Sequence, residues 1–358
     1  MPKENSSTDQ TALLTEAVRH AAEKNTPLIV QGGGTKSFYG RLPAGRVLDV
    51  SIHHGILSYE PTELVITARA GTSLHEIETV LAGNNQMMAF EPPRFGSGGT
   101  LGGAVAAGLS GPRRPYSGSV RDFVLGIKMI NGMGEVLKFG GQVMKNVAGY
   151  DVSRLLTGSL GTLGVLLEIS LKVLPIPKVE LTLIRESSGH EAVRLFNEFS
   201  GRPLPVNGAC HIRDRAYLRL AGTEQGVRAA RSKVGGELLG DGKKFWASVR
   251  DQTHAFFEDD TPLWRFSVPG ASAQFPRQGQ QLIDWGGALR WLKTDENREV
   301  LFDLAVAQGG HASLFRNGNR HEEVFQQLSP AMMKIHQKLK QKFDPDGILN
   351  PGRMYKAF

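Results

Sequence analysis

The N-terminal half of the chain alternates short apolar stretches with polar and glycine-rich segments. Apolar residues recur at helical spacing over 10–24, which predicts a helix. Pro27 ends this pattern, and the apolar run 27–30 that it begins predicts a short buried strand. Two further runs, at 46–50 and 64–68, are rich in valine, leucine and isoleucine and predict additional strands.

Local sequence signals predict a second helix and the point at which the N-terminal half of the chain ends. Residues 73–82 are predicted to form a helix, with Ser73 as its N-cap and Glu76 completing a capping box. A strongly β-patterned stretch at 165–174 ends at the prolines of 175–177, where we place a domain boundary. The order of strands, turns and helix is typical of an α+β nucleotide-binding domain.

The second half of the chain is also mixed, but its composition differs. It contains strand-like segments at 180–185 and 216–220 and amphipathic helices at 191–200 and 224–235. A C-terminal helix is predicted at 330–343. The tail DPDGILNPGRMY follows the last helix, and we expect it to be ordered.

Composition indicates a soluble globular protein. The 358 residues are 40% hydrophobic and 22% charged, which supplies ample core material and favours two domains over one. The net charge of +7 is scattered along the chain, and general surface charge explains it most simply. Attraction for an anionic cofactor, an acidic partner subunit or a membrane surface is the alternative, whereas no motif indicates nucleic-acid binding.

The single cysteine and the N-terminal residues exclude further classes of protein. Cys210 alone excludes an internal disulfide, a single-chain Fe–S cluster and a cysteine-rich zinc site, and we expect it to be a small core residue. The first residues lack the apolar core of a signal peptide, and no apolar run approaches the ~20 residues that span a bilayer. We expect a cytoplasmic protein with at most peripheral contact with the inner face of the cell membrane.

Four glycine-rich clusters carry the strongest functional signal. They are QGGGTKS at 31–37, FGSGGTLGG at 95–103, PYSGS at 115–119 and GSLGTLG at 158–164. The first is not a P-loop, because Thr35 rather than glycine precedes the lysine, and it lacks the third glycine of a dinucleotide fingerprint. Several turns spread over this distance predict a long, extended ligand bound by backbone amides, which fits FAD better than ATP or a nicotinamide cofactor. A plain turn between two strands is the alternative for 31–37.

The order of these motifs resembles the FAD-binding domain of the vanillyl-alcohol oxidase/p-cresol methylhydroxylase (PCMH) family. The resemblance runs from about Pro27 to Pro175 and includes GYDVSRLLTGSLGTLG, a specific signature of that family. The tail FDPDGILNPGRMY resembles the C-terminal segment of FAD-linked hydroxy-acid oxidases. Longer stretches, such as PTELVITARAGT and IDWGGALRWLK, resemble the FAD-binding subunits of bacterial glycolate oxidases.

This resemblance implies a fold and a division of the chain. The fold class would be α+β, with a two-subdomain PCMH-type FAD-binding domain over 1–177. An α+β cap domain with an antiparallel sheet would follow over 178–340. The tail, 341–358, would return to the FAD-binding domain.

The resemblance also implies roles for individual residues in binding FAD. The pyrophosphate would be held by Gly32, Gly33, Gly34, Thr35 and Lys36. Both the pyrophosphate and the flavin would be flanked by Gly99, Thr100, Gly102 and Gly103. The cofactor channel would be lined by Ser117, Gly118 and Asp122, and the adenine would lie near Gly164 and Val165. The family's KN…GYD stretch corresponds to Lys145, Asn146 and Gly149. Because the first glycine loop has no histidine, we expect FAD to be bound non-covalently.

Candidate catalytic residues come from the second half of the chain. Oxidation of a 2-hydroxy acid needs a base for the hydroxyl proton and a cation for the carboxylate, next to the flavin. The candidates are His311, in the segment GGHASLFRNGNRH that also contains Arg320, with Arg290, Arg353 and Asn350. A packed histidine and structural ion pairs are the simpler alternatives. The segment lacks the closely spaced histidines of metal-dependent relatives, so we expect no metal.

Three hypotheses for function follow from the resemblance. The first is an FAD-binding subunit of a glycolate oxidase complex that oxidises glycolate, a small 2-hydroxy acid, to glyoxylate, together with a catalytic FAD paralogue and an Fe–S subunit. The lone cysteine agrees with a cluster in another chain. The second is a non-catalytic electron-relay or structural flavin subunit, and the third is a self-sufficient 2-hydroxy-acid dehydrogenase of D-lactate type.

Overall fold

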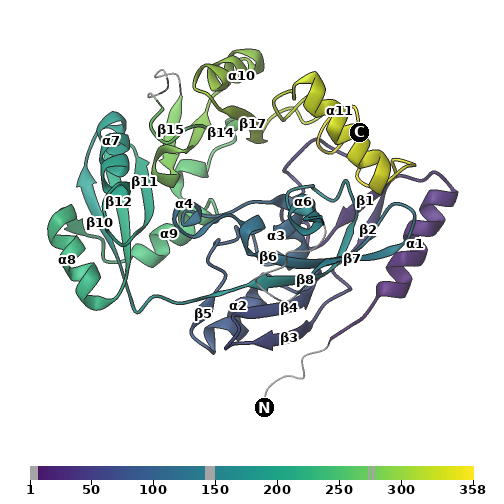
Figure 1. Ribbon diagram of the computed structural model, residues 1–358. Coiled ribbons are helices and arrows are strands. Elements are labelled where there is room, and N and C mark those ends of the chain that lie inside the picture. Colours follow the sequence, from purple (N-terminus) through teal and green to yellow (C-terminus); the bar gives the residue numbers. More distant parts are fainter. Residues whose placement is uncertain (1–6, 142–149, 273–274, 276–278) are drawn as a thin grey trace.

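Two β-sheets of different size dominate the protein (Figure 1). The structure is a computed structural model that describes residues 7–141, 150–272, 275 and 279–358. The smaller sheet has five strands in the order β3-β4-β8-β6-β7, and the larger has eight in the order β13-β10-β12-β11-β15-β16-β14-β17. Neighbouring strands in both sheets are antiparallel. The predicted α+β fold with an antiparallel sheet in the second half is confirmed.

The five-stranded sheet and its surroundings come from the first half of the chain. Its strands are β3 (Ile56–Glu60), β4 (Val65–Arg69), β6 (Val124–Ile130), β7 (Val136–Gly140) and β8 (Val165–Lys172). The short strands outside it are β1 (Leu28–Gln31), β2 (Arg46–Asp49), β5 (Gln86–Met87) and β9 (Leu174–Pro175). The helices are α1 (Thr11–Glu23), α2 (Leu74–Ala82), α3 (Leu101–Ala107), α4 (Arg114–Ser117), α5 (Val120–Phe123) and α6 (Val152–Leu156).

The eight-stranded sheet comes from the second half. Its strands are β10 (Val179–Glu186), β11 (Val206–Ile212), β12 (Arg215–Gly222), β13 (Glu237–Leu238), β14 (Leu263–Ser267), β15 (Gln280–Asp284), β16 (Leu289–Lys293) and β17 (His311–Arg316). The α-helices are α7 (Gly189–Ser200), α8 (Glu224–Val234), α9 (Gly242–Arg250), α10 (Arg298–Ala307) and α11 (Pro330–Phe343), with short 3₁₀ turns at Ala255–Phe257 and Trp285–Gly287. Helices α7 and α8 lie against β10–β12 (Figure 1).

The helices predicted over 10–24, 73–82 and 330–343 are confirmed within a residue or two. Ser73 is the N-cap of α2, and its hydroxyl accepts the N–H of Glu76 at 3.0 Å. Such a cap satisfies an N–H that the helix itself leaves without a partner.

The C-terminal tail is bound to the first strand. The Leu28 N–H donates to the carbonyl of Ile348 at 2.7 Å, and the Asn350 N–H donates back to the carbonyl of Leu28 at 2.9 Å. The yellow C-terminal segment therefore lies beside the purple strand β1 in Figure 1. Buried Lys340 of α11 adds a second attachment, since its ammonium donates to the carbonyls of Thr162 and Leu349 at 2.8 and 2.7 Å.

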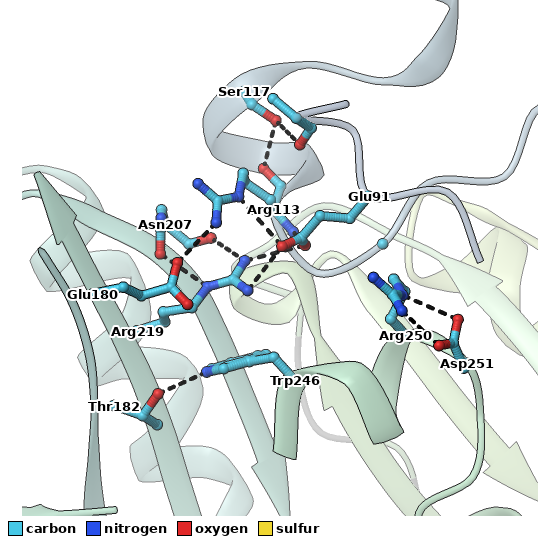
Figure 2. Close-up of polar contacts among 12 residues, drawn as sticks. Glu91, Arg113, Ser117, Glu180, Thr182, Asn207, Arg219, Trp246, Arg250 and Asp251 are labelled. Carbon is cyan, nitrogen blue, oxygen red and sulfur yellow. Dashed lines mark hydrogen bonds and ion pairs between the residues drawn. The ribbon is translucent and has the colours of Figure 1, made fainter. Parts of the chain in front are cut away.

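A buried network of charges joins the two halves (Figure 2). The carboxylate of Glu91 lies 2.8 Å from the guanidinium of Arg219 on β12 and accepts the N–H of Arg113 at 2.8 Å. Arg113 also reaches across to Glu180 on β10 at 2.9 Å, and Arg219 donates to Asn207 at 2.9 Å. Burial alone would raise the pKa of Glu91, but Arg219 and Arg113 outweigh it and hold the pKa below its usual value. The network fixes the large sheet against the loops of the first half.

Within the described part of the chain, no helix is both long and apolar enough to cross a membrane.

We expect Glu91→Gln to weaken the junction between the halves. Removing this charge leaves buried Arg219 without a carboxylate partner and Arg113 with Glu180 alone, which costs about 3–5 kcal/mol and should lower a thermal unfolding midpoint by about 5–15 °C at neutral pH. The ionised carboxylate stabilises the fold above its usual pKa of 4.5, and this contribution is lost as the pH falls through the lowered folded pKa. The gap between wild type and variant should therefore shrink in acid.

Glu224→Gln is the control, because Glu224 forms an exposed pair with Arg228 on one helix. Its unfolding midpoint should match that of the wild type. Equal midpoints for wild type and Glu91→Gln at neutral pH would contradict the proposed importance of the network.

Candidate functional site

A cavity of about 450 Å³ opens where the glycine-rich turns meet the C-terminal tail. Most of its walls come from residues 29–38, residues 100–107, residues 160–166 and the C-terminal Arg320, Asn350 and Arg353, and Leu42, Pro43, Val50 and Ala70 complete them. The first, second and fourth glycine clusters, which are far apart in the sequence, therefore converge on one space. This arrangement suits a single long ligand contacted from several loops.

The first two glycine turns pack backbone to backbone. A Cβ atom added at Gly33 would lie 1.5 Å from the carbonyl oxygen of Gly98, a separation that no side chain allows. Thr100 continues the second turn as the N-cap of α3, and its hydroxyl accepts the Gly103 N–H at 3.2 Å. Glycine at position 33 is therefore required by the contact between the loops, and that contact forms one wall of the cavity.

Asn350 attaches the tail to two other walls. Its side-chain oxygen accepts the Val30 N–H at 2.9 Å, and its amide donates to the carbonyl of Leu160 at 2.6 Å. The residue is buried and adopts a left-handed backbone with φ of 43°. A Cβ at Gly161 would lie 2.7 Å from the Asn350 amide nitrogen. Asn350 thus holds β1 and the fourth glycine cluster together.

The cavity is positively charged at one end. Its lining residues include Lys36, Arg320 and Arg353, and no aspartate or glutamate among the described residues lines it. Burial lowers the pKa of Lys36 to about 8, and burial together with nearby Arg320 lowers the pKa of Arg353 to about 10. An anion would stabilise the charged forms of these groups.

Apolar residues also line the cavity, among them Val50, Ala70 and Leu166. The three lie close together. The Ala70 N–H donates a hydrogen bond to the carbonyl of Leu167, the neighbour of Leu166, and the carbonyl of Val50 lies beside Gly71, the neighbour of Ala70. A ligand with an anionic part and a flat apolar ring matches this distribution.

Many of the predicted cofactor residues line the cavity, and some do not. The lining set contains Gly32, Gly33, Gly34, Thr35, Lys36, Thr100, Gly102, Gly103 and Gly164. Gly99 and Val165 are next in sequence to lining residues, and Val165 is buried at the start of β8. Lys145, Asn146 and Gly149 lie outside the described residues.

The third glycine cluster lies away from the cavity lining and has local partners. The Ser117 hydroxyl donates to the carbonyl of Ala89 at 2.9 Å, and Gly118 adopts a φ of 104°. The Asp122 carboxylate accepts the N–H of Ser119 at 2.8 Å and completes the capping box of α5. Turn and helix geometry therefore explain why serine, glycine and aspartate occur at these three positions.

The four predicted catalytic residues are not brought together. Asn350 and Arg353 line the cavity, whereas His311 is exposed at the start of β17, opposite Ser267. Arg290 is fully buried in β16 and donates to the carbonyl of Gly287 at 2.7 Å. Burial lowers the pKa of Arg290 to about 10. Across the described ranges, no group of three or more His, Cys, Asp or Glu side chains is placed to hold a metal.

Sequence reasoning did not assign Arg320 and Phe38 to the cofactor site. Arg320 lies in the same segment as His311, but only the path of the chain after β17 brings it to the cavity. Phe38 lines the cavity and stacks edge-on with Phe95 and Phe315, with ring centroids 5.3 Å apart in both cases. No local motif marks either residue.

Comparison with known proteins agrees with this geometry. Residues 8–140 match the family model described as FAD binding domain, and residues 318–354 match the model described as FAD linked oxidases, C-terminal domain. The chain is 50% identical to glycolate oxidase subunit GlcE of Escherichia coli (strain K12), over 97% of this chain and 98% of that protein. It is 31% identical to glycolate oxidase subunit GlcD of Bacillus subtilis (strain 168), over 46% of this chain and 35% of that protein.

A solved structure shares the fold. Alkyldihydroxyacetonephosphate synthase superposes with a TM-score of 0.68 at 16% identity, covering 94% of this chain and 74% of that one. The family model and this neighbour agree with the predicted PCMH-type fold, and the family model agrees with FAD as the cofactor.

We expect Gly33→Ala to abolish most FAD binding, because the new methyl group would force the first two turns apart. FAD content is measured after purification, from the absorbance of the protein and of the released cofactor. Gly83→Ala is the control, since a Cβ there meets its nearest atom at 3.4 Å and the backbone is right-handed. Normal FAD content in Gly33→Ala would show that the contact between the turns does not shape the site.

Proposed function

Since this chain belongs to the GlcE family of glycolate oxidase subunits, we propose that it is the FAD-binding subunit of a complex that oxidises glycolate to glyoxylate. The observation that carries the proposal is the cavity that glycine turns, three cations and apolar residues line together. The specificity for a 2-hydroxy acid rests on the relatives and is part of the proposal.

The residues present fit FAD. Gly32, Gly33 and Gly34 offer successive backbone amides beside Lys36, a combination that suits a diphosphate. The apolar lining residues suit a flat ring, and the small residues Ala106 and Ala107 of α3 leave room for it. Bound FAD would supply the acceptor for the two electrons that glycolate loses on becoming glyoxylate. The chain's own residues bind and orient the cofactor and exclude water from it.

One observation favours the second candidate function, in which this subunit does no chemistry on the substrate itself. Among the described residues, none between 167 and 319 lines the cavity, so the eight-stranded sheet contributes no side chain to it. Phe38 lines the cavity and packs edge-on against Phe95 and against Phe315, which belongs to β17 of that sheet. A base and a cation for the substrate would then have to come from a partner chain, and the role of this subunit would be structural or electron-relaying.

The relatives and the composition support a proposal for the partners. In the proposed complex we include a catalytic FAD paralogue of GlcD type, which the relatives suggest, and an Fe–S subunit, which the sequence resemblance alone suggests. Cys210 is fully buried, and burial raises the pKa of its thiol, so the chain's only cysteine is unsuited to hold a cluster. We place the complex in the cytoplasm, with at most peripheral contact with the membrane.

The purified chain should release unmodified FAD on acid treatment. Glycolate added without oxygen should leave the visible absorbance of the isolated chain unchanged and bleach that of the complex reconstituted with a GlcD-type partner. His311→Ala should keep the FAD content of the wild type, because His311 does not line the cavity. A chain without FAD overturns the main proposal, and bleaching of the isolated chain overturns the second candidate in favour of a self-sufficient dehydrogenase.

A further inference from the structure

The loop after the first glycine turn is joined to two C-terminal segments by backbone hydrogen bonds. The Arg41 N–H donates to the carbonyl of Arg353 at 2.8 Å. The Leu42 N–H donates to the carbonyl of Arg320 at 3.2 Å. These bonds place the side chains of Arg320 and Arg353, which come from the C-terminal family segment 318–354, at the rim of an N-terminal cavity.

The two guanidinium groups are oriented by carbonyls of the same loop. Arg353 donates to the carbonyls of Lys36 and Ser37 at 3.3 and 3.2 Å. Arg320 donates to the carbonyl of Gly40 at 2.7 Å. Each arginine has five N–H donors, so these bonds fix its position and leave further donors for a ligand.

No carboxylate balances these charges. In the parts of the chain that the structure describes, no Asp or Glu oxygen lies within 4.0 Å of either guanidinium. Arg41, from the same loop, differs in this respect: it lies 3.8 Å from Glu323 and does not line the cavity. Arg320 and Arg353 repel each other and are partly desolvated, and both costs fall when an anion lies between them.

We infer that Arg320 and Arg353 bind the diphosphate of the cofactor together with Lys36, so that cofactor binding fastens the C-terminal segment to the glycine turns. This inference rests on the proposed FAD-binding function. It assigns Arg353 to the cofactor rather than to the substrate, and it adds Arg320 to the site. Arginine suits this role, because its planar fork matches phosphate oxygens in a fixed geometry.

The inference predicts a specific loss of affinity. Arg320→Gln and Arg353→Gln should each weaken FAD binding about 10- to 100-fold, the usual effect of losing a hydrogen-bonded charge. Titrations of the chain freed of FAD measure this, with three probes: FAD, ADP and riboflavin. ADP binding should weaken by a similar factor, while riboflavin, which has no phosphate, should bind wild type and variants equally.

Two further readouts separate ligand contact from a structural role. Raising the salt concentration should weaken FAD binding to the wild type more steeply than to either variant, because salt screens charge. Hydrogen exchange of the tail amides of Ile348 and Leu349 should slow on addition of FAD in the wild type, and less so in Arg353→Gln. Arg353→Lys, which keeps the charge but not the fork, should retain part of the affinity.

Arg41→Gln is the matched control. It removes hydrogen bonds to the carbonyls of His321 and Gly352 from the same junction, but no charge that lines the cavity. FAD affinity and its salt dependence should stay at the wild-type level.

The possible failures are distinguishable. A wild-type chain that binds no FAD contradicts the proposed function itself. Wild-type affinity in both arginine variants overturns the inference and leaves the function standing. Loss of FAD and riboflavin binding with unchanged ADP binding also overturns it, since the cations would then act on the flavin ring instead of the diphosphate.

Discussion

The close contact between the first two glycine turns is the constraint on which the rest of the site depends. Gly33 touches the backbone of Gly98, and any side chain at position 33 would separate the turns. This contact lies just before Thr100, the N-cap of α3, and so places the small residues of that helix along the cavity. The tail completes the arrangement, because Asn350 bonds to both Val30 and Leu160. A site built from backbone contacts in this way has little tolerance for larger residues.

A second constraint determines what the site can reach. The network around Glu91 holds the large sheet against the first half, and the Trp285 indole adds a hydrogen bond to the carbonyl of Gly111 at 3.0 Å. With the halves held together, Phe38 of the cavity wall packs against Phe95 and against Phe315 of β17. In this arrangement neither His311 nor Arg290 lines the cavity, and this observation underlies the idea that substrate chemistry belongs to a partner chain.

Sequence patterns predicted those parts of the protein that depend on local rules. The helix at 73–82 was predictable from its cap, and the helix at 330–343 from its period and its proline. The glycine turns indicated an extended ligand, because their spacing reflects backbone geometry. The charge at the cavity rim was harder to predict, since Arg320 and Arg353 are 33 positions apart and meet only through hydrogen bonds to one loop. For the same reason, the sequence around His311 could not show in advance on which face of β17 this histidine lies.

The central claim is that FAD occupies the cavity with its diphosphate between the glycine turns and the C-terminal arginines. A crystal structure of the purified, FAD-loaded chain tests it most directly. The account predicts diphosphate density against the amides of residues 32–35, with the guanidinium groups of Arg320 and Arg353 within hydrogen-bonding distance. FAD bound elsewhere on the chain, or a diphosphate turned away from both arginines, would contradict it.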